Sequence, residues 1–194
     1  MIRKISTPDH ATPLSHDERK GLIPARVSTH AELNALEEEN ILSAMLWAFS
    51  RRRDPVSESF GKNLHKRMFG RVWRWAGAYR RSEKNLGVAY GMIPSRMAET
   101  MERLAYWCTH KTFETDEIAV RFHHALVSIH PFPNGNGRWS RLMADLLAVR
   151  LGRPRFGWGQ SALREGDDVR RLYIDALRAA DGHDFGPLLH FARR

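Results

Sequence analysis

Two helical patterns separated by a short loop rich in proline and glycine constrain the fold of this chain more than any other feature. Apolar residues recur at helical spacing over 118–129 and again over 139–147. The first helix must end near His130, because Pro131 and Pro133 both disfavour its continuation. The sequence therefore predicts two amphipathic helices joined by a tight loop.

Most of the remaining chain also shows helical signals. Thr29 followed by Glu32 is a capping-box pattern that opens a helix, which ends within 51–55. Further helices are predicted over residues 60–69, from Pro94 to Trp107, from Thr115 as an N-cap, over 167–180 and from about 185. Residues 79–93 are poor in helical pattern and predict a loop or a short hairpin, whereas residues 1–28 predict an irregular arm. We expect an all-α architecture with one small β element.

The chain is basic. It has 194 residues, with 31 Lys and Arg against 22 Asp and Glu, and a formal net charge of +9. Such an excess suggests an anionic partner, such as nucleic acid, nucleotide phosphates or an acidic protein, although a basic solvated surface gives the same total. The hydrophobic share of 42% is enough for a packed core and excludes wholesale disorder.

Several classes of protein are disfavoured by what the sequence lacks. Its longest apolar runs are a few residues, short of the ~20 that a membrane helix needs. The first residues lack the apolar region of a signal peptide, so we expect a cytoplasmic protein with no membrane partner. Cys108 is the only cysteine, which leaves no intrachain disulfide and no CxxC zinc site.

The loop between the two helices has the composition of an anion site. Gly135 and Gly137 bracket Asn136, so the backbone can turn sharply and bring its N–H groups close to a ligand. The free N–H groups and the dipole of the helix that follows favour a negative charge at the same place.

Charged side chains flank this anion site on both sides. Arg138 and Arg141 lie one helical turn apart, so their guanidinium groups can converge on one polyanion. His130 faces them across the loop. This arrangement suits the removal of a proton from a hydroxyl that attacks a phosphorus atom. Alternatively, the segment is a plain surface loop with two arginines and a capping histidine.

The segment 130–141 resembles a known family signature. It is His-Pro-Phe-Pro-Asn-Gly-Asn-Gly-Arg-Trp-Ser-Arg, and the motif of Fic (filamentation induced by cAMP) proteins is His-Pro-Phe-x-Asp/Glu-Gly-Asn-Gly-Arg-x-x-Arg. Only Asn134 departs from a fixed position. The segments 72–80 and 173–188 also resemble parts of a Fic core, and the whole chain is similar to the Fic subgroup called mobile mystery protein B.

The resemblance implies a fold and a reaction. It implies an all-α Fic domain over 29–194, with a β-hairpin flap at about 79–93 and an active-site loop at 130–138. Most Fic proteins bind ATP with Mg²⁺ and transfer AMP to a Ser, Thr or Tyr hydroxyl of a target protein. The implied roles are His130 as general base, Gly135, Asn136 and Gly137 as anion hole, Arg138 and Arg141 as phosphate ligands, Phe132 as loop anchor, and Asn134 as metal ligand. An amide oxygen at Asn134 would bind Mg²⁺ less strongly than a carboxylate.

Two further segments acquire expected roles from the resemblance. The flap would align the target by strand addition, with Lys84 and Asn85 as candidate contacts. Many Fic proteins carry an inhibitory Ser/Thr-x-x-x-Glu-Gly/Asn helix. Here Glu39 followed by Asn40 fits its end, whereas Ala35 does not fit its start. Glu39 would then block the γ-phosphate site at Arg141; otherwise residues 37–39 form a solvated acidic face.

Other functions stay open at this point. A Doc-like phosphotransferase of the same superfamily carries Lys where this chain has Gly137, so Gly137 favours AMP transfer. A basic nucleic-acid-binding module without catalysis is a third interpretation, disfavoured by the motif. The subgroup resemblance also suggests a toxin-like role on a mobile element, with a small DNA-binding or antitoxin-like partner.

Overall fold

The described residues form eight α-helices, one 3-10 turn and no strand. The computed structural model describes residues 14–24, 27, 29–51, 54–159 and 166–194. In these residues the elements are α1 (His16–Arg19), α2 (His30–Phe49), α3 (Glu58–Phe69), η1 (Tyr90–Met92), α4 (Ile93–His110), α5 (Thr115–Ile129), α6 (Asn136–Arg150), α7 (Gly166–Asp181) and α8 (Gly186–Arg193). The expected all-α architecture is confirmed.

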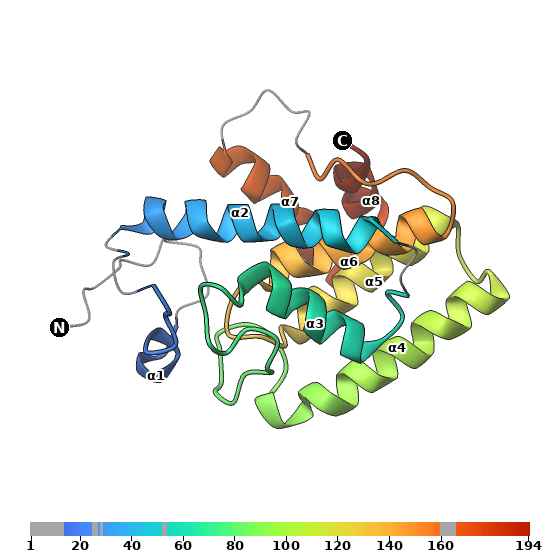
Figure 1. Cartoon of the computed structure of the whole chain (residues 1–194). Coiled ribbons are helices and arrows are strands. Elements are labelled where there is room, and N and C mark those ends of the chain that lie inside the picture. The colour runs from blue at the N-terminus through green and yellow to red at the C-terminus, as the bar shows by residue number, and fades with distance from the viewer. Residues whose placement is uncertain (1–13, 25–26, 28, 52–53, 160–165) are drawn as a thin grey trace.

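The helices α5 and α6 form the centre of the molecule. They pack against each other, α4 lies against α5, and α2 pairs with α3 as α7 pairs with α8. Figure 1 shows α2 and α3 in front of α6 and α5, with α4 along the lower right. The core between them holds the fully buried rings of Phe122, Phe132 and Trp139. The loop joining α5 to α6 is therefore fixed from both sides by packed helices.

The helix ends agree with the sequence in most places. Thr29 and Glu32 form the predicted capping box, in which each side chain accepts a hydrogen bond from the backbone N–H of the other. Pro94 lies in the first turn of α4. The prediction of Thr115 as an N-cap is wrong by one residue, because Glu114 holds that position without a side-chain cap bond. The helix α3 starts two residues earlier than predicted, because the Ser57 hydroxyl accepts from the Phe60 N–H.

The arm before residue 29 is more ordered than expected where the structure describes it. Ser15 and Glu18 form a second capping box that starts the short helix α1. Leu22 then forms an isolated antiparallel bridge with Trp73. The arm therefore packs on the body of the domain, and its first thirteen residues lie outside the described part of the chain.

Residues 79–89 form a loop that leads into η1 and α4, and the expected β-hairpin is not present over 79–93. The loop is held by Arg80, whose side chain is completely buried. Its guanidinium donates to the carbonyl oxygens of Ser82 at 2.9 Å, of His130 at 2.8 Å, and of Val88. Two of these bonds satisfy carbonyl groups within the flap, and the third ties the flap to the active-site loop. No helix in the described ranges is long and apolar enough to cross a membrane.

Candidate active site

His130 lies at the C-cap of α5 in the left-handed conformation, with φ of 53°. It is 7% exposed, and its backbone carbonyl accepts the hydrogen bond from Arg80 Nε. Burial first, and the positive charge of Arg80 second, lower the pKa of His130 to about 4. The imidazole is therefore neutral at physiological pH, which is the state that a general base needs.

The loop after His130 is braced internally. The side-chain oxygen of Asn136 accepts from the Phe132 N–H at 2.9 Å, and its amide donates back to the Phe132 carbonyl at 2.8 Å. Asn136 is 2% exposed. Its side chain spans the loop, whereas the anion-hole role predicted for residues 135–137 concerns their backbone N–H groups and stays a prediction. Phe132 is fully buried, as its expected anchoring role requires.

The two glycines of the loop differ in the room that each position leaves for a side chain. Gly135 has φ of +80°, and a Cβ there would lie 2.5 Å from the Phe69 ring. A Cβ on Gly137 would meet nothing closer than the Tyr173 hydroxyl, at 3.9 Å. Gly135 is thus required by packing, whereas Gly137 faces open space. The first turn of α6 has no side-chain cap, so no capping side chain competes with an anion for its N–H groups.

Arg138 extends from this first turn of α6 and Arg141 from the next turn. Arg141 Nε donates to the Gly137 carbonyl at 3.1 Å, and its guanidinium carbon lies 5.6 Å from the centre of the Tyr173 ring. Burial lowers the pKa of Arg141, with the like charge of Arg138 as a smaller cause. Two guanidinium groups that already repel each other are stabilised by a shared anion.

Arg138 is held by a carboxylate from α2. Its Nη2 donates to Glu37 Oε2 at 2.6 Å, while Glu37 Oε1 accepts from Trp73 Nε1 at 2.7 Å. Glu37 is 4% exposed. Glu39, which was expected to reach Arg141, lies on the exposed face of α2. The signal for Glu37 was its spacing, four residues after Leu33 and seven before Ala44 on the buried face of α2.

The candidate active site offers few protein ligands for a Mg²⁺ ion. The side-chain oxygen of Asn134 accepts from the adjacent Gly135 N–H at 2.5 Å. Among the residues described, no group of three or more His, Cys, Asp or Glu side chains could hold a metal ion. Mg²⁺ commonly takes one or two protein ligands and completes its shell with substrate phosphates and water. The residues present fit an ion of that kind, held chiefly by phosphate.

The two candidate flap residues differ in accessibility. Lys84 has a side chain only 4% exposed, because its Nζ lies 2.5 Å from Glu18 Oε2 of the N-terminal arm. Ser82 donates to the other oxygen of the same carboxylate. Asn85 is exposed. Of the two, Asn85 alone is presented on the surface of the flap.

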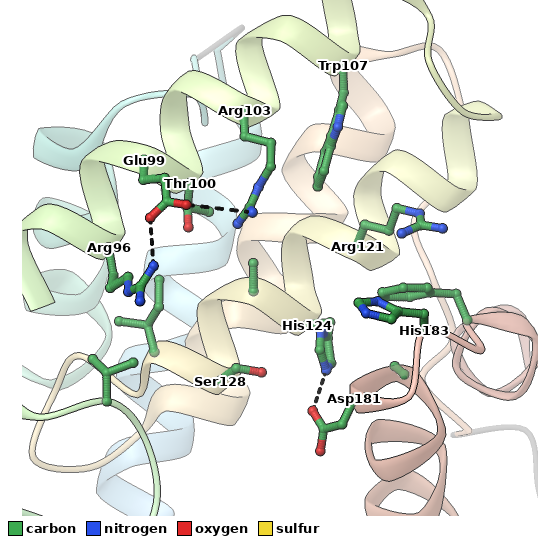
Figure 2. Close-up of a pocket in the computed structure, with 15 residues that line it drawn as sticks. Arg96, Glu99, Thr100, Arg103, Trp107, Arg121, His124, Ser128, Asp181 and His183 are labelled. Carbon is green, nitrogen blue, oxygen red and sulfur yellow. Dashed lines mark hydrogen bonds and ion pairs between the residues drawn. The ribbon is translucent and has the colours of Figure 1, made fainter. Parts of the chain in front are cut away.

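A pocket of about 410 Å³ lies beside the C-terminal half of α5. Figure 2 shows it between α4, α5 and the turn from α7 to α8, with the His124–Asp181 pair on one side and Arg96, Glu99 and Arg103 on the other. Val88 of the flap and Ile129 also line it, and Ile129 precedes His130. Ile129 is the lining residue nearest in sequence to the candidate base, and no residue of the segment 130–141 lines the pocket.

The overall fold matches that of known structures. The N-terminal Fic domain of a putative cell filamentation protein from Bartonella quintana superposes with a TM-score of 0.71 at 14% identity, covering 92% of both chains. BepC from Bartonella tribocorum was solved with bound AMPPNP. It superposes with a TM-score of 0.68 at 16% identity, covering 92% of this chain and 97% of that one. The fold is therefore that of the class of Fic domains.

Sequence comparison gives the family. The Fic/DOC family model matches residues 55–148. "Protein adenylyltransferase Fic" of Drosophila melanogaster is 36% identical over 132 residues, which is 66% of this chain and 25% of that protein. The chain therefore carries a Fic domain. It spans about a quarter of the length of the curated relatives it matches, and its similarity to the mobile mystery protein B subgroup stays a prediction.

Proposed function

We propose that this chain is a protein adenylyltransferase, which transfers AMP from ATP to a Ser, Thr or Tyr hydroxyl of a target protein. The observation that carries the proposal is the placement of a buried, neutral His130 beside the open first turn of α6, where Arg138 and Arg141 supply positive charge. The similarity to relatives named as adenylyltransferases supports it.

The reaction follows from these groups. The target hydroxyl oxygen forms a bond to the α-phosphorus, the bond from that phosphorus to the β-phosphate oxygen breaks, and pyrophosphate leaves. The imidazole of His130 takes the hydroxyl proton. The first-turn N–H groups of α6 and the two arginines bind the phosphate oxygens and stabilise the charge that develops on them. Mg²⁺ would supply further neutralisation of the phosphate charge, with Asn134 as the protein ligand.

The pocket beside Ile129 is our candidate for the adenosine part of the nucleotide. Its volume lies in the range of small-molecule sites, and Ser128 and Asp181 provide hydrogen-bonding groups on its wall. Replacing Ala125, which lines the pocket, by Trp should fill it. Calorimetry should then show weaker ATP binding with an unchanged thermal midpoint; equal ATP affinity would exclude the pocket.

Gly137 favours AMP transfer over phosphoryl transfer. The space above it is open up to the Tyr173 hydroxyl, whereas a lysine there, as in Doc, would occupy the room available to the phosphates. Labelling with ATP carrying ³²P at either the α- or the γ-phosphate separates the functions. The adenylyltransferase transfers only α-label, a Doc-like enzyme transfers only γ-label, and a non-catalytic nucleic-acid-binding protein transfers neither.

Regulation and context complete the proposal. The carboxylate that competes with phosphate for the motif arginines is Glu37, through Arg138. We propose a cytoplasmic, toxin-like protein whose activity is restrained by α2, with a small DNA-binding or antitoxin-like partner. Co-expression with the gene product encoded next to it, followed by co-purification, tests for that partner.

A further inference from the structure

His65 of α3 connects two segments of the site that are distant in sequence. It is fully buried. Its Nε2 lies 3.0 Å from the carbonyl oxygen of Asn134, 69 residues further along the chain. Its Nδ1 accepts from the Gly77 N–H, also at 3.0 Å, at the start of the flap segment. One imidazole thus binds both the active-site loop and the root of the flap.

The two partners fix the tautomer of the ring. The Gly77 N–H is a donor only, so Nδ1 must present a lone pair. The Asn134 carbonyl is an acceptor only, so Nε2 must carry the hydrogen. Each ring nitrogen therefore has the one role that its partner allows, and a neutral Nε2–H imidazole satisfies both.

Packing holds the ring in this orientation. The imidazole stacks on Phe132 of the active-site loop, with centroids 3.7 Å apart and planes inclined by 19°. Phe69 lies on another side, with a centroid distance of 4.7 Å. A ring that cannot rotate keeps both hydrogen bonds in place, and through them the loop backbone at Asn134.

We propose that His65 is a positioning residue for AMP transfer, which sets the active-site loop and the flap root relative to each other through its two directional hydrogen bonds. It touches neither nucleotide nor target. The proposal rests on the proposed function for its kinetic part, and on the two hydrogen bonds alone for its structural part.

Three substitutions separate the contributions of the ring. In His65→Gln the amide nitrogen lies near the place of Nε2 and can still donate to Asn134. In His65→Asn the amide oxygen lies near the place of Nδ1 and can still accept from Gly77. His65→Phe keeps the stacked ring and loses both bonds. Leu64→Ala, at the adjacent and equally buried position of α3, is the control for a general loss of stability.

Self-labelling with α-³²P-ATP gives the kinetic result. We expect the maximal rate to fall about 100-fold in His65→Phe and about tenfold in each single-bond variant, because small displacements of reacting groups reduce rates strongly. The dissociation constant for ATP should stay within about twofold, since the first turn of α6 is not altered. A fall in Leu64→Ala equal to that in His65→Phe, at matched thermal midpoints, would overturn the positioning role.

Nuclear magnetic resonance tests the structural part without any activity. In the wild-type protein, the ¹⁵N shifts of the His65 ring should report a protonated Nε2 and a bare Nδ1. The Gly77 amide resonance should move in His65→Gln and stay in His65→Asn. The opposite tautomer would overturn the proposal. A wild-type protein that shows the expected tautomer but transfers no label would instead count against the proposed function.

Discussion

At the scale of single residues, burial decides which side chains of the candidate site carry a charge. His130 is neutral because the protein surrounds it with low-dielectric material and with the guanidinium of Arg80. Its base form is therefore present at every pH well above about 4. We expect no loss of rate from His130 protonation between pH 6 and pH 8.

Substitution of His130 should separate chemistry from binding. In His130→Ala the rate of AMP transfer should fall by ~10²–10⁴-fold, because the attacking hydroxyl loses its general base. ATP affinity should be retained, since the imidazole serves the hydroxyl and not the phosphates. Single-turnover labelling together with calorimetry measures both quantities. Transfer at the wild-type rate would remove His130 from the mechanism.

Glu37 offers a second test at this scale. Glu37→Gln removes the charge that holds Arg138, while the amide oxygen can still accept from Trp73 Nε1. We expect tighter ATP binding and faster self-labelling, because the freed guanidinium can bind phosphate, where a charge-assisted contact contributes ~1.5–3 kcal/mol. Glu39→Gln, on the exposed face, is the control and should change neither. Slower labelling in Glu37→Gln would mean that Glu37 orients Arg138 productively.

At the scale of elements, the sequence predicted the parts whose signals are local. Helical periodicity and two prolines located α5, the loop and α6, and the capping box located the start of α2. For the flap, the residue pattern predicted a loop or a short hairpin, and the described residues form a loop in which Arg80 makes contacts that no local pattern reveals. The contacts of Glu37 and His65 were not predicted, because their partners in the site lie 101 and 69 residues away in the sequence.

The contact between the arm and the flap gives a prediction about elements. Burial opposes the charge on Glu18, but hydrogen bonds from Lys84, Ser15 and Ser82 together hold its pKa below the usual range. Glu18→Gln should weaken the contact with Lys84, and hydrogen exchange over 82–88 should become faster. Asp17→Asn, which alters only an exposed pair with Lys20, is the control. Equal exchange in both variants would show that the arm does not restrain the flap.

At the scale of the whole molecule, one carboxyl in α6 links stability to pH. Asp145 is 4% exposed, and its Oδ1 accepts from the Phe156 N–H and from Trp158 Nε1. Burial outweighs these bonds and raises the pKa of Asp145 from 3.8 to about 6. Because the folded value exceeds the unfolded one, this group's contribution to stability is present below pH 4 and is lost as the pH rises to about 6.

Asp145→Asn should remove that dependence. Its amide oxygen can still accept both hydrogen bonds, and no buried charge remains at neutral pH. We expect a free energy of unfolding higher than wild type by about 1–3 kcal/mol at pH 7.5 and no gain at pH 4. Urea denaturation at the two pH values measures the difference. A gain of the same size at both values would contradict the assignment.

The anchoring of the flap by Arg80 affects how freely the amino-acid sequence of the flap can vary. A strand in a ladder must keep its alternation and register, since a slip by one residue turns every side chain to the opposite face. Between Ser82 and Val88, whose carbonyls are both held by one guanidinium, no such rule applies. The positions between these two anchors behave like a hypervariable loop on a fixed framework. A library randomised at 85 and 86, both exposed, would therefore sample new targets while the framework that carries His130 stays unchanged.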